Sequence, residues 1–263
     1  MLIFLKLGGS LITNKDIPFS ARKDTLRHLG AEISEALTKN PKLKLLIGHG
    51  SGSFGHSTAA QFGTRTGIRS AEDWLGFQKV WWSAHQLNYI VIKEFLNLGL
   101  PIISLPPSAS LISSNKKIDQ WNIQPVISSL KNNLLPMVFG DVVIDKELGA
   151  TIFSTEELFS YLVNVLHPNR ILLAGKERGV FQDYPRNQDL ISLITPDTYP
   201  LISSKINASA STDVTGGMAS KVRSMLDQIT LDENLSIDIF SGEEEGNLFK
   251  VISGEKIGTR ISR

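Results

Sequence analysis

Short apolar runs alternate with segments of helical periodicity along this chain of 263 residues. Strands are predicted at the apolar runs, which cover residues 2–7, 44–47, 101–104, 136–139, 170–173 and 236–240. Helices are predicted between them, at residues 22–39, 70–97, 123–130, 156–166 and 214–229. Residues 142–153 resemble a β-hairpin that turns near Gly149. Strands that alternate with helices predict an α/β fold, in which helices cover both faces of a mostly parallel sheet.

The composition is that of an ordinary folded protein, because 41% of the residues are hydrophobic and 20% are charged. A chain of this length can form one large domain or two lobes. A formal net charge of +1 gives no global attraction to nucleic acid or to an anionic membrane, and neither is predicted as a partner. The chain holds no cysteine, which excludes disulfides, thiolate metal sites and cysteine nucleophiles. The first apolar run ends at Lys6. It is too short for a signal peptide or a membrane span, and this predicts a cytoplasmic protein.

A glycine-rich loop follows the second predicted strand and contains Gly50, Gly52 and Gly55 between two histidines, His49 and His56. Glycines allow backbone N–H groups to turn toward a bound anion. A histidine at the exit of such a loop can bond a phosphate. We therefore expect an anion site here, with His56 at the phosphate and His49 packed at the end of its strand.

Two other interpretations of this loop are open. The spacing Gly-x-Gly-x-x-Gly matches the dinucleotide fingerprint, which also requires an acidic residue at the end of the next strand. Glu72 and Asp73 lie near that distance, but they open a predicted helix rather than end a strand. Alternatively, the loop is a tight strand-to-helix connection with no ligand.

Lysines accompany glycines at both ends of the chain. Lys6 ends the first predicted strand beside Gly8 and Gly9, and a lysine at a buried strand end is costly unless it meets an anion or reaches solvent. Lys221 follows Gly217 by one helical turn, where helix N–H groups favour phosphate. The spacing is not that of a Walker A loop. Together the three segments predict a phosphoryl-transfer site that needs no covalent intermediate.

Four motifs occur in a fixed order: Lys-x-Gly-Gly-Ser from Lys6, His-Gly-x-Gly-x-Phe-Gly-His from His49, Gly-Asp-Val-Val-x-Asp from Gly140 and Asp-Val-Thr-Gly-Gly-Met-x-x-Lys from Asp213. This set resembles the amino acid kinase superfamily, and within it the isopentenyl phosphate kinases. The resemblance implies a three-layer αβα fold and a homodimer. It also implies that ATP, with Mg²⁺, phosphorylates isopentenyl phosphate or a similar isoprenoid monophosphate. An acceptor lobe (residues 1–166) and a nucleotide lobe (residues 167–263) would form a single kinase domain.

The resemblance also implies roles for individual residues. Lysines would neutralise the transferring phosphate, a histidine would bond the acceptor phosphate, and a carboxylate would orient the lysines or hold magnesium through water. These catalytic residues are Lys6, Lys15, His56, Lys221 and Glu156. The expected substrate-binding residues are Ser51, Gly55, His56, Gly140 and Asp141. The expected ATP-binding residues are Lys6, Gly8, Gly9, Ser10, Gly52, Gly175, Lys176, Gly179, Gly217 and Lys221.

Three segments depart from the pattern of that family. Ser51 replaces a glycine, Ser-Thr-Glu-Glu from Ser154 replaces Ser-Gly-Asp-Asp, and residues 175–181 carry basic residues where acidic ones are usual. The acceptor's hydrocarbon tail requires an apolar slot, and we expect some residue of the helix at 70–98 to contact it. A fosfomycin-type kinase and a non-catalytic nucleotide-binding module on the same fold are the alternative functions.

Overall fold

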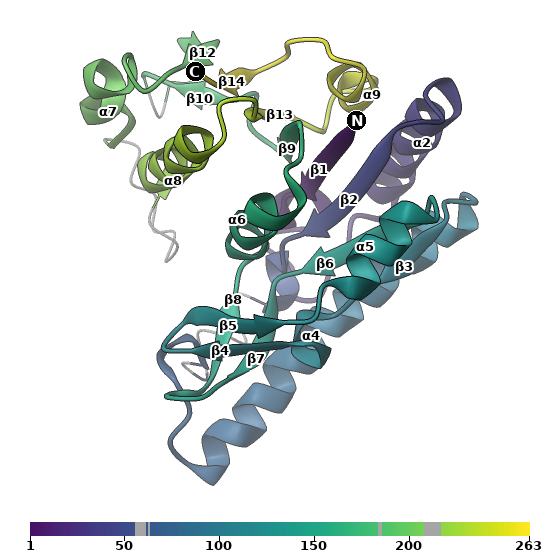
Figure 1. The fold of residues 1–263 in the computed structure, drawn as a ribbon, viewed down its shortest axis with the longest axis vertical. Coiled ribbons are helices and arrows are strands. Elements are labelled where there is room, and N and C mark those ends of the chain that lie inside the picture. Colours follow the sequence, from purple (N-terminus) through teal and green to yellow (C-terminus); the bar gives the residue numbers. More distant parts are fainter. Residues whose placement is uncertain (56–61, 63, 184–185, 208–216) are drawn as a thin grey trace.

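A mostly parallel sheet forms the middle of the molecule (Figure 1). The computed structural model describes residues 1–55, 62, 64–183, 186–207 and 217–263. Within those residues the sheet has the order β12-β14-β13-β9-β1-β2-β6-β3, and β13 pairs with β14 in the antiparallel sense. Its strands are β1 (Leu2–Leu7), β2 (Lys44–His49), β3 (Ile102–Ser104), β6 (Leu135–Phe139), β9 (Arg170–Gly175), β12 (Leu193–Ile194), β13 (Ser236–Ser241) and β14 (Thr259–Ile261).

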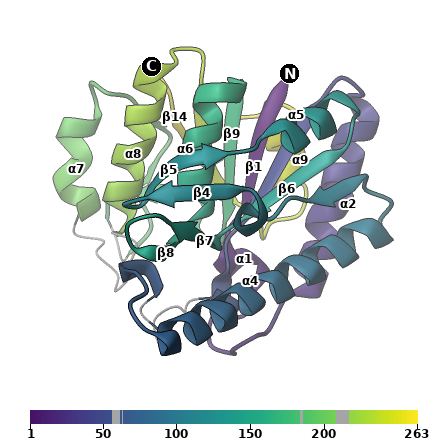
Figure 2. The same ribbon diagram turned by 60° about the horizontal axis from the view of Figure 1, so that its bottom comes forward.

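Helices cover both faces of this sheet, which confirms the three-layer prediction (Figure 2). One face carries α5 (Gln124–Lys131), α6 (Thr155–Leu166) and α8 (Gly217–Leu231). The opposite face carries α2 (Lys23–Lys39), α4 (Ala71–Asn97) and α9 (Asn247–Ile252). A capping box opens α4, because Ser70 Oγ accepts from Asp73 N and the Asp73 carboxylate accepts from Ser70 N. The helices predicted at residues 22–39, 70–97, 123–130 and 156–166 start and end within one residue of the observed ones. The start of the helix predicted at residues 214–229 lies outside the described residues.

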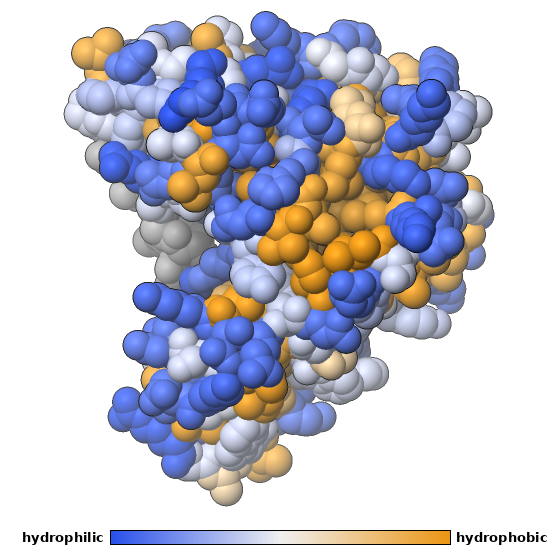
Figure 3. Space-filling model, viewed as in Figure 1, coloured by the Kyte–Doolittle hydropathy of each residue, from blue (hydrophilic) through white to orange (hydrophobic). Residues whose placement is uncertain are grey.

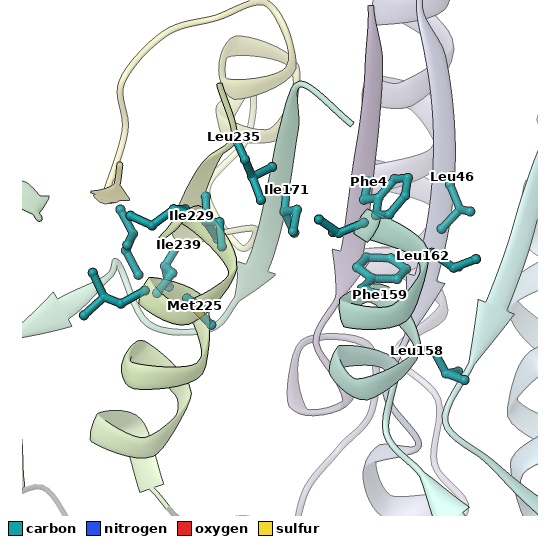
Figure 4. Packing of buried hydrophobic residues seen from close by; sticks show 14 of the residues in the cluster. Phe4, Leu46, Leu158, Phe159, Leu162, Ile171, Met225, Ile229, Leu235 and Ile239 are labelled. Atoms are coloured by element: carbon teal, nitrogen blue, oxygen red, sulfur yellow. The ribbon is translucent and has the colours of Figure 1, made fainter. Parts of the chain in front are cut away.

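The central strands are apolar on both faces because both are buried. Side chains of β1 alternate between the two cores: Phe4 lies in the cluster with α6 and α8, and Leu5 in the cluster with α2 and α4. Figure 4 shows α6 placing Leu158, Phe159 and Leu162 over this layer, while α8 packs against the β9–β13 side. The Phe4 and Phe159 rings lie 5.1 Å apart. Burial of these side chains holds α6 at a fixed position over β1.

A second, smaller sheet has the order β5-β4-β7-β8. The predicted hairpin is confirmed as β7 (Asp141–Asp145) and β8 (Gly149–Phe153), whereas β4 (Leu111–Ser114) and β5 (Lys117–Trp121) were not predicted. Asp145 is 1% exposed and ties the two hairpin turns together. Its carboxylate accepts from the backbone N–H groups of residues 115, 116, 147 and 148 and from the Ser113 hydroxyl.

Short elements complete the fold. They are α1 (Gly9–Ile12), α7 (Tyr199–Asn207), β10 (Val180–Phe181), β11 (Leu190–Ile191) and the 3₁₀ helices η1 (Thr64–Thr66) and η2 (Pro107–Ala109). Figure 3 shows apolar side chains gathered in the middle of one face, between α5 and α6. The sheet residues Phe4, Leu46 and Val138 on this face are themselves fully buried. In the described part of the chain, no helix is both long enough and apolar enough to cross a membrane.

Candidate active site

The two N-terminal glycine segments contact each other where β1 and β2 end. These strands are parallel neighbours, with Leu7 opposite His49, so their following loops start side by side. A Cβ on Gly9 would lie 2.4 Å from the Gly52 backbone nitrogen, and Gly52 has a φ of +49°. Thr13 links the loops, because its hydroxyl donates to the Gly9 carbonyl at 2.7 Å and accepts from Ser53 N at 3.0 Å. Glycine is required at both positions by this close approach.

Lys6 leaves β1 at the same edge and forms an ion pair with Glu156 in the first turn of α6. Two contacts fix that turn. Ser154 caps the helix in a capping box with Glu157, and the Thr155 hydroxyl donates to the His49 carbonyl at 2.6 Å. Thr155 replaces the glycine that is usual in the family at this position, and its hydrogen bond attaches α6 to the end of β2. The carboxylate of Glu156 is thereby held beside the glycine loops.

The electrostatics of Glu156 bring Lys221 into the same site. Burial raises the pKa of the Glu156 carboxyl, but the charge and hydrogen bond of Lys6, together with the charge of Lys221, leave the pKa below its ordinary value. Glu156 is therefore anionic at neutral pH. Lys6 and Lys221 lie 215 positions apart in the sequence, but the charges of both act on this single carboxylate.

A cavity of about 210 Å³ opens between α6 and α8 next to these groups. Its floor is apolar and comes from β9 and β13, through Ile171, Leu173 and Ile237. Glu156, Lys221 and Arg65 stand among its polar lining. Arg65 was not predicted from the sequence, because a single arginine between two threonines carries no periodic or motif signal. The cavity thus joins an apolar surface to a cluster of charges.

The other predicted ATP-binding residues occupy several places. Gly8 donates its N–H to the Ala174 carbonyl at 2.8 Å, which joins the first glycine turn to the end of β9. Gly175 ends β9, and a Cβ on Gly179 would lie 2.5 Å from Thr259 Oγ1. Ser10 and Lys176 are exposed. Gly217 begins α8. Their contacts with a nucleotide stay predictions.

The structure describes some of the predicted acceptor-side residues but not all of them. His56 lies outside the described residues. Gly55 must be a glycine because a Cβ there would lie 2.4 Å from the Ser51 side chain. Lys15 is exposed in the loop that precedes Ser20 and does not line the cavity. The structure therefore joins Lys6, Glu156 and Lys221, and the roles of the acceptor-side residues stay predictions.

Asp141 and His85 form a polar cluster beside Gly140. Asp141 is 1% exposed, and its carboxylate accepts from Ser108 N at 3.1 Å and lies 3.3 Å from His85 Nε2. Trp81 packs on the His85 ring with 4.4 Å between centroids. These contacts make Asp141 a support for the end of β6 and the start of β7, and its predicted contact with substrate stays a prediction.

His49 is packed inside the protein, as the sequence interpretation expected. Its ring is 1% exposed and stacks on Phe139. Nδ1 donates to the Gly50 carbonyl at 3.1 Å, and Nε2 accepts from Asn88 Nδ2 at 3.1 Å. Burial lowers the pKa of His49 to about 4, against smaller raising effects of the Gly50 hydrogen bond and the Asp141 charge. The neutral ring therefore holds the start of the glycine loop through its hydrogen bond to the Gly50 carbonyl.

Acid should destabilise the protein through His49. Because the pKa is lower in the folded state, the unfolded state binds this proton first as the pH falls below about 6.5. The resulting loss of unfolding free energy is about 2 kcal/mol between about pH 7.5 and about pH 5. We expect His49→Gln to be less stable at neutral pH but to lack this part of the pH dependence. Urea unfolding of both proteins at the two pH values measures the difference, and equal pH dependence would contradict the assignment.

Comparison with known proteins identifies the family. The model of the "Amino acid kinase family" matches residues 1–240. The chain belongs to this family. The chain is 32% identical to the isopentenyl phosphate kinase of Methanocaldococcus jannaschii, over 99% of this chain and 98% of that one. It is 31% identical to the isopentenyl phosphate kinase of Methanothermobacter thermautotrophicus, over 99% of both chains.

Solved structures give the same result for the fold of this chain. An X-ray structure of an isopentenyl phosphate kinase superposes over 100% of both chains with a TM-score of 0.82 and 29% sequence identity. The predicted resemblance is therefore confirmed along the whole chain, and the dinucleotide interpretation of the glycine loop is not supported.

Proposed function

We propose that this member of the amino acid kinase family transfers the γ-phosphoryl group of ATP to isopentenyl phosphate, giving isopentenyl diphosphate and ADP. The observation that carries the proposal is the cluster in which Lys6 is ion-paired with Glu156 and the charge of Lys221 acts on the same carboxylate, in a chain that resembles isopentenyl phosphate kinases over its full length. Both substrates of this reaction are anions. Cations are needed between them because their negative charges must approach each other.

The reaction follows from direct transfer. An oxygen of the acceptor phosphate attacks the γ-phosphorus, and the bond from that phosphorus to the β–γ bridging oxygen breaks, so that ADP leaves with the electron pair. Lys6 and Lys221 would stabilise the charge on the transferring group, and the anionic Glu156 would hold their ammonium groups in place. His56, which lies outside the described residues, would bond the acceptor phosphate.

Magnesium fits the chemistry of this site as a companion of ATP. Mg²⁺ is usually held by one or two carboxylates together with phosphate oxygens and water. Glu156 is an anionic carboxylate at the site, and its ion pair with Lys6 favours contact with the metal through water. When bound, Mg²⁺ would neutralise charge on the ATP phosphates.

The two proposed lobes would meet at this cavity. Glu156 and Phe159 precede residue 166, whereas Ile171, Lys221 and Ile237 follow it, and all five line the cavity. This supports the proposed division into an acceptor lobe (residues 1–166) and a nucleotide lobe (residues 167–263), with transfer taking place between them.

Product analysis tests the function. The purified protein, with ATP and Mg²⁺, is given isopentenyl phosphate or fosfomycin in parallel, and ³¹P NMR follows the phosphorus signals. We expect a diphosphate from isopentenyl phosphate and an unchanged fosfomycin signal. Phosphorylation of fosfomycin alone would favour the phosphonate kinase, and ATP binding without any transfer would favour the non-catalytic module.

We also propose a homodimer that forms through α4. Four apolar side chains, Leu75, Trp82, Tyr89 and Leu96, follow each other at intervals of seven and are each more than half exposed. Seven residues make nearly two helical turns, so these side chains share one face of α4. The adjacent strand β3 is an edge strand and exposes Ile103. A continuous exposed apolar face is typical of a protein–protein interface, and a second copy of this chain offers a matching surface.

A charge placed on this face should separate the protomers. We expect the double substitution Trp82→Glu and Tyr89→Glu to give a monomer, because two carboxylates would be buried without partners in the interface. Light scattering after size-exclusion chromatography measures the mass. Leu201→Glu, at an exposed leucine of α7, is the control and should stay dimeric. A monomeric unsubstituted protein would contradict the proposal.

A further inference from the structure

Arg65 occupies a fixed position at the rim of the cavity. It belongs to η1, whose Thr64 is 1% exposed. The Arg65 carbonyl accepts from the Thr151 hydroxyl at 3.4 Å, and Ile68 N donates to the Leu148 carbonyl at 2.8 Å. These bonds attach the backbone around Arg65 to the β7–β8 hairpin. The arginine backbone is therefore held in place, and its side chain alone has freedom to change partner.

The guanidinium of Arg65 is paired with a carboxylate that has another task. Arg65 Nη2 lies 3.2 Å from Glu157 Oε1, and both side chains are more than 40% exposed. The second oxygen of Glu157 accepts from Ser154 N at 2.6 Å and completes the cap of α6. Glu157 thus stays in place without Arg65. An exposed pair of this kind adds little stability, so exchange of partners costs little.

The charges that line the cavity are balanced before any substrate arrives. Arg65 and Lys221 contribute two positive charges, and Glu156 and Glu157 contribute two negative ones. Lys6 is already paired with Glu156. The γ-phosphoryl group of ATP would bring additional negative charge to this cluster, in which Lys6, Lys221 and Arg65 face two carboxylates. Arginine is suited to such a group, because its planar fork binds two phosphate oxygens at once.

We propose that Arg65 is a phosphate-binding residue of the transfer site, whose guanidinium leaves Glu157 and binds the γ-phosphoryl group when ATP enters. This proposal rests on the kinase function argued above. Arg65 makes no covalent bond and moves no proton; it exchanges one anionic partner for another. Glu157 then keeps its hydrogen bond to Ser154 N and continues to cap α6.

Three variants and two nucleotides test the proposal. Arg65→Gln removes the charge, Arg65→Lys keeps the charge without the fork, and Glu157→Gln frees Arg65 while retaining a residue that suits the capping box. Calorimetry measures binding of a non-hydrolysable ATP analogue and of ADP, which lacks the γ-phosphoryl group. We expect Arg65→Gln to bind the analogue about tenfold more weakly, as for one lost charge-assisted hydrogen bond, and to bind ADP as the unsubstituted protein does.

Steady-state kinetics with ATP and isopentenyl phosphate provide the second readout. We expect kcat/KM for ATP to fall with Arg65→Gln, to recover partly with Arg65→Lys and to be retained with Glu157→Gln. Urea unfolding checks that each variant folds. If Arg65→Gln does not fold, binding of the ATP analogue and of ADP is compared for Arg65→Lys instead. Equal weakening of the analogue and ADP, or unchanged binding of both, would overturn the proposal. Absence of turnover by the unsubstituted protein would instead contradict the kinase function, while the binding comparison would still decide the role of Arg65.

Discussion

Replacing Lys6 by Gln is expected to lower kcat for phosphoryl transfer by about 10²- to 10³-fold, as for the loss of one preorganised group that stabilises transition-state charge. Lys6 is at the end of β1, is 14% exposed in its side chain and is paired with Glu156. Its ammonium therefore has a fixed position in the cluster. Glutamine keeps most of the side-chain length but carries no charge. Steady-state kinetics with ATP and isopentenyl phosphate measures the loss.

Two further variants make this prediction specific. Lys42→Gln changes an exposed lysine before β2 and should keep the unsubstituted rate. If Lys6 and Lys221 act on the same transferring group, the double variant should lose much less than the product of the two single losses. A Lys6→Gln enzyme with a normal kcat, or losses that multiply fully, would show that the two lysines do not work together.

Replacing Asp238 by Ala is expected to lower the free energy of unfolding by about 3–5 kcal/mol, because a buried ion pair loses one partner. Asp238 lies in β13 and is 1% exposed. One carboxylate oxygen accepts from Arg170 Nη2 at 2.6 Å and Nε at 3.1 Å, and the other accepts from Arg260 Nε at 2.7 Å. Without the Asp238 carboxylate, the partly buried guanidinium groups of Arg170 and Arg260 would face each other with no negative charge between them. Urea unfolding at neutral pH measures the change.

The matched control for this substitution is Asp24→Ala. Asp24 pairs with Arg27 on α2, but its side chain is 99% exposed, and the loss should stay within about 0.5 kcal/mol. Asp238→Asn, which keeps the shape and removes the charge, should fall between the two. If Asp238→Ala is no less stable than the control, Asp238 does not hold β9, β13 and β14 together as described.

The parts of the fold that were predicted correctly have local signals. An apolar run buried on both faces marks β1, and the Ser70 and Asp73 pair marks the start of α4 within four residues. The β4–β5 hairpin was missed because its stability comes from a distant residue. Asp145 lies some thirty positions further along and holds the turn at residues 115 and 116. Hydrogen bonds from these and neighbouring groups outweigh burial and lower the pKa of Asp145 to about 2.

The candidate site shows the same division between local and distant information. Phosphate chemistry could be predicted because the glycines and the lysine of each segment lie within a few residues of each other in the sequence. The pairing of Lys6 with Glu156 spans 150 positions, and spacing along the chain says nothing about it. Glu156 was reached through the family resemblance, and Arg65 was missed, because its place depends on where η1 attaches to the hairpin. The sequence therefore predicted candidate charged residues such as Lys6 and Lys221. The fold determines which charged side chains, such as Lys6 and Glu156, come into contact.

A crystal structure with a non-hydrolysable ATP analogue and isopentenyl phosphate bound together is the most direct measurement. We expect Lys6 Nζ and Lys221 Nζ each to lie about 3 Å from oxygens of the γ-phosphoryl group, which faces the acceptor phosphate in one cleft. Phosphates bound elsewhere, with either ammonium group pointing away from them, would contradict this expectation.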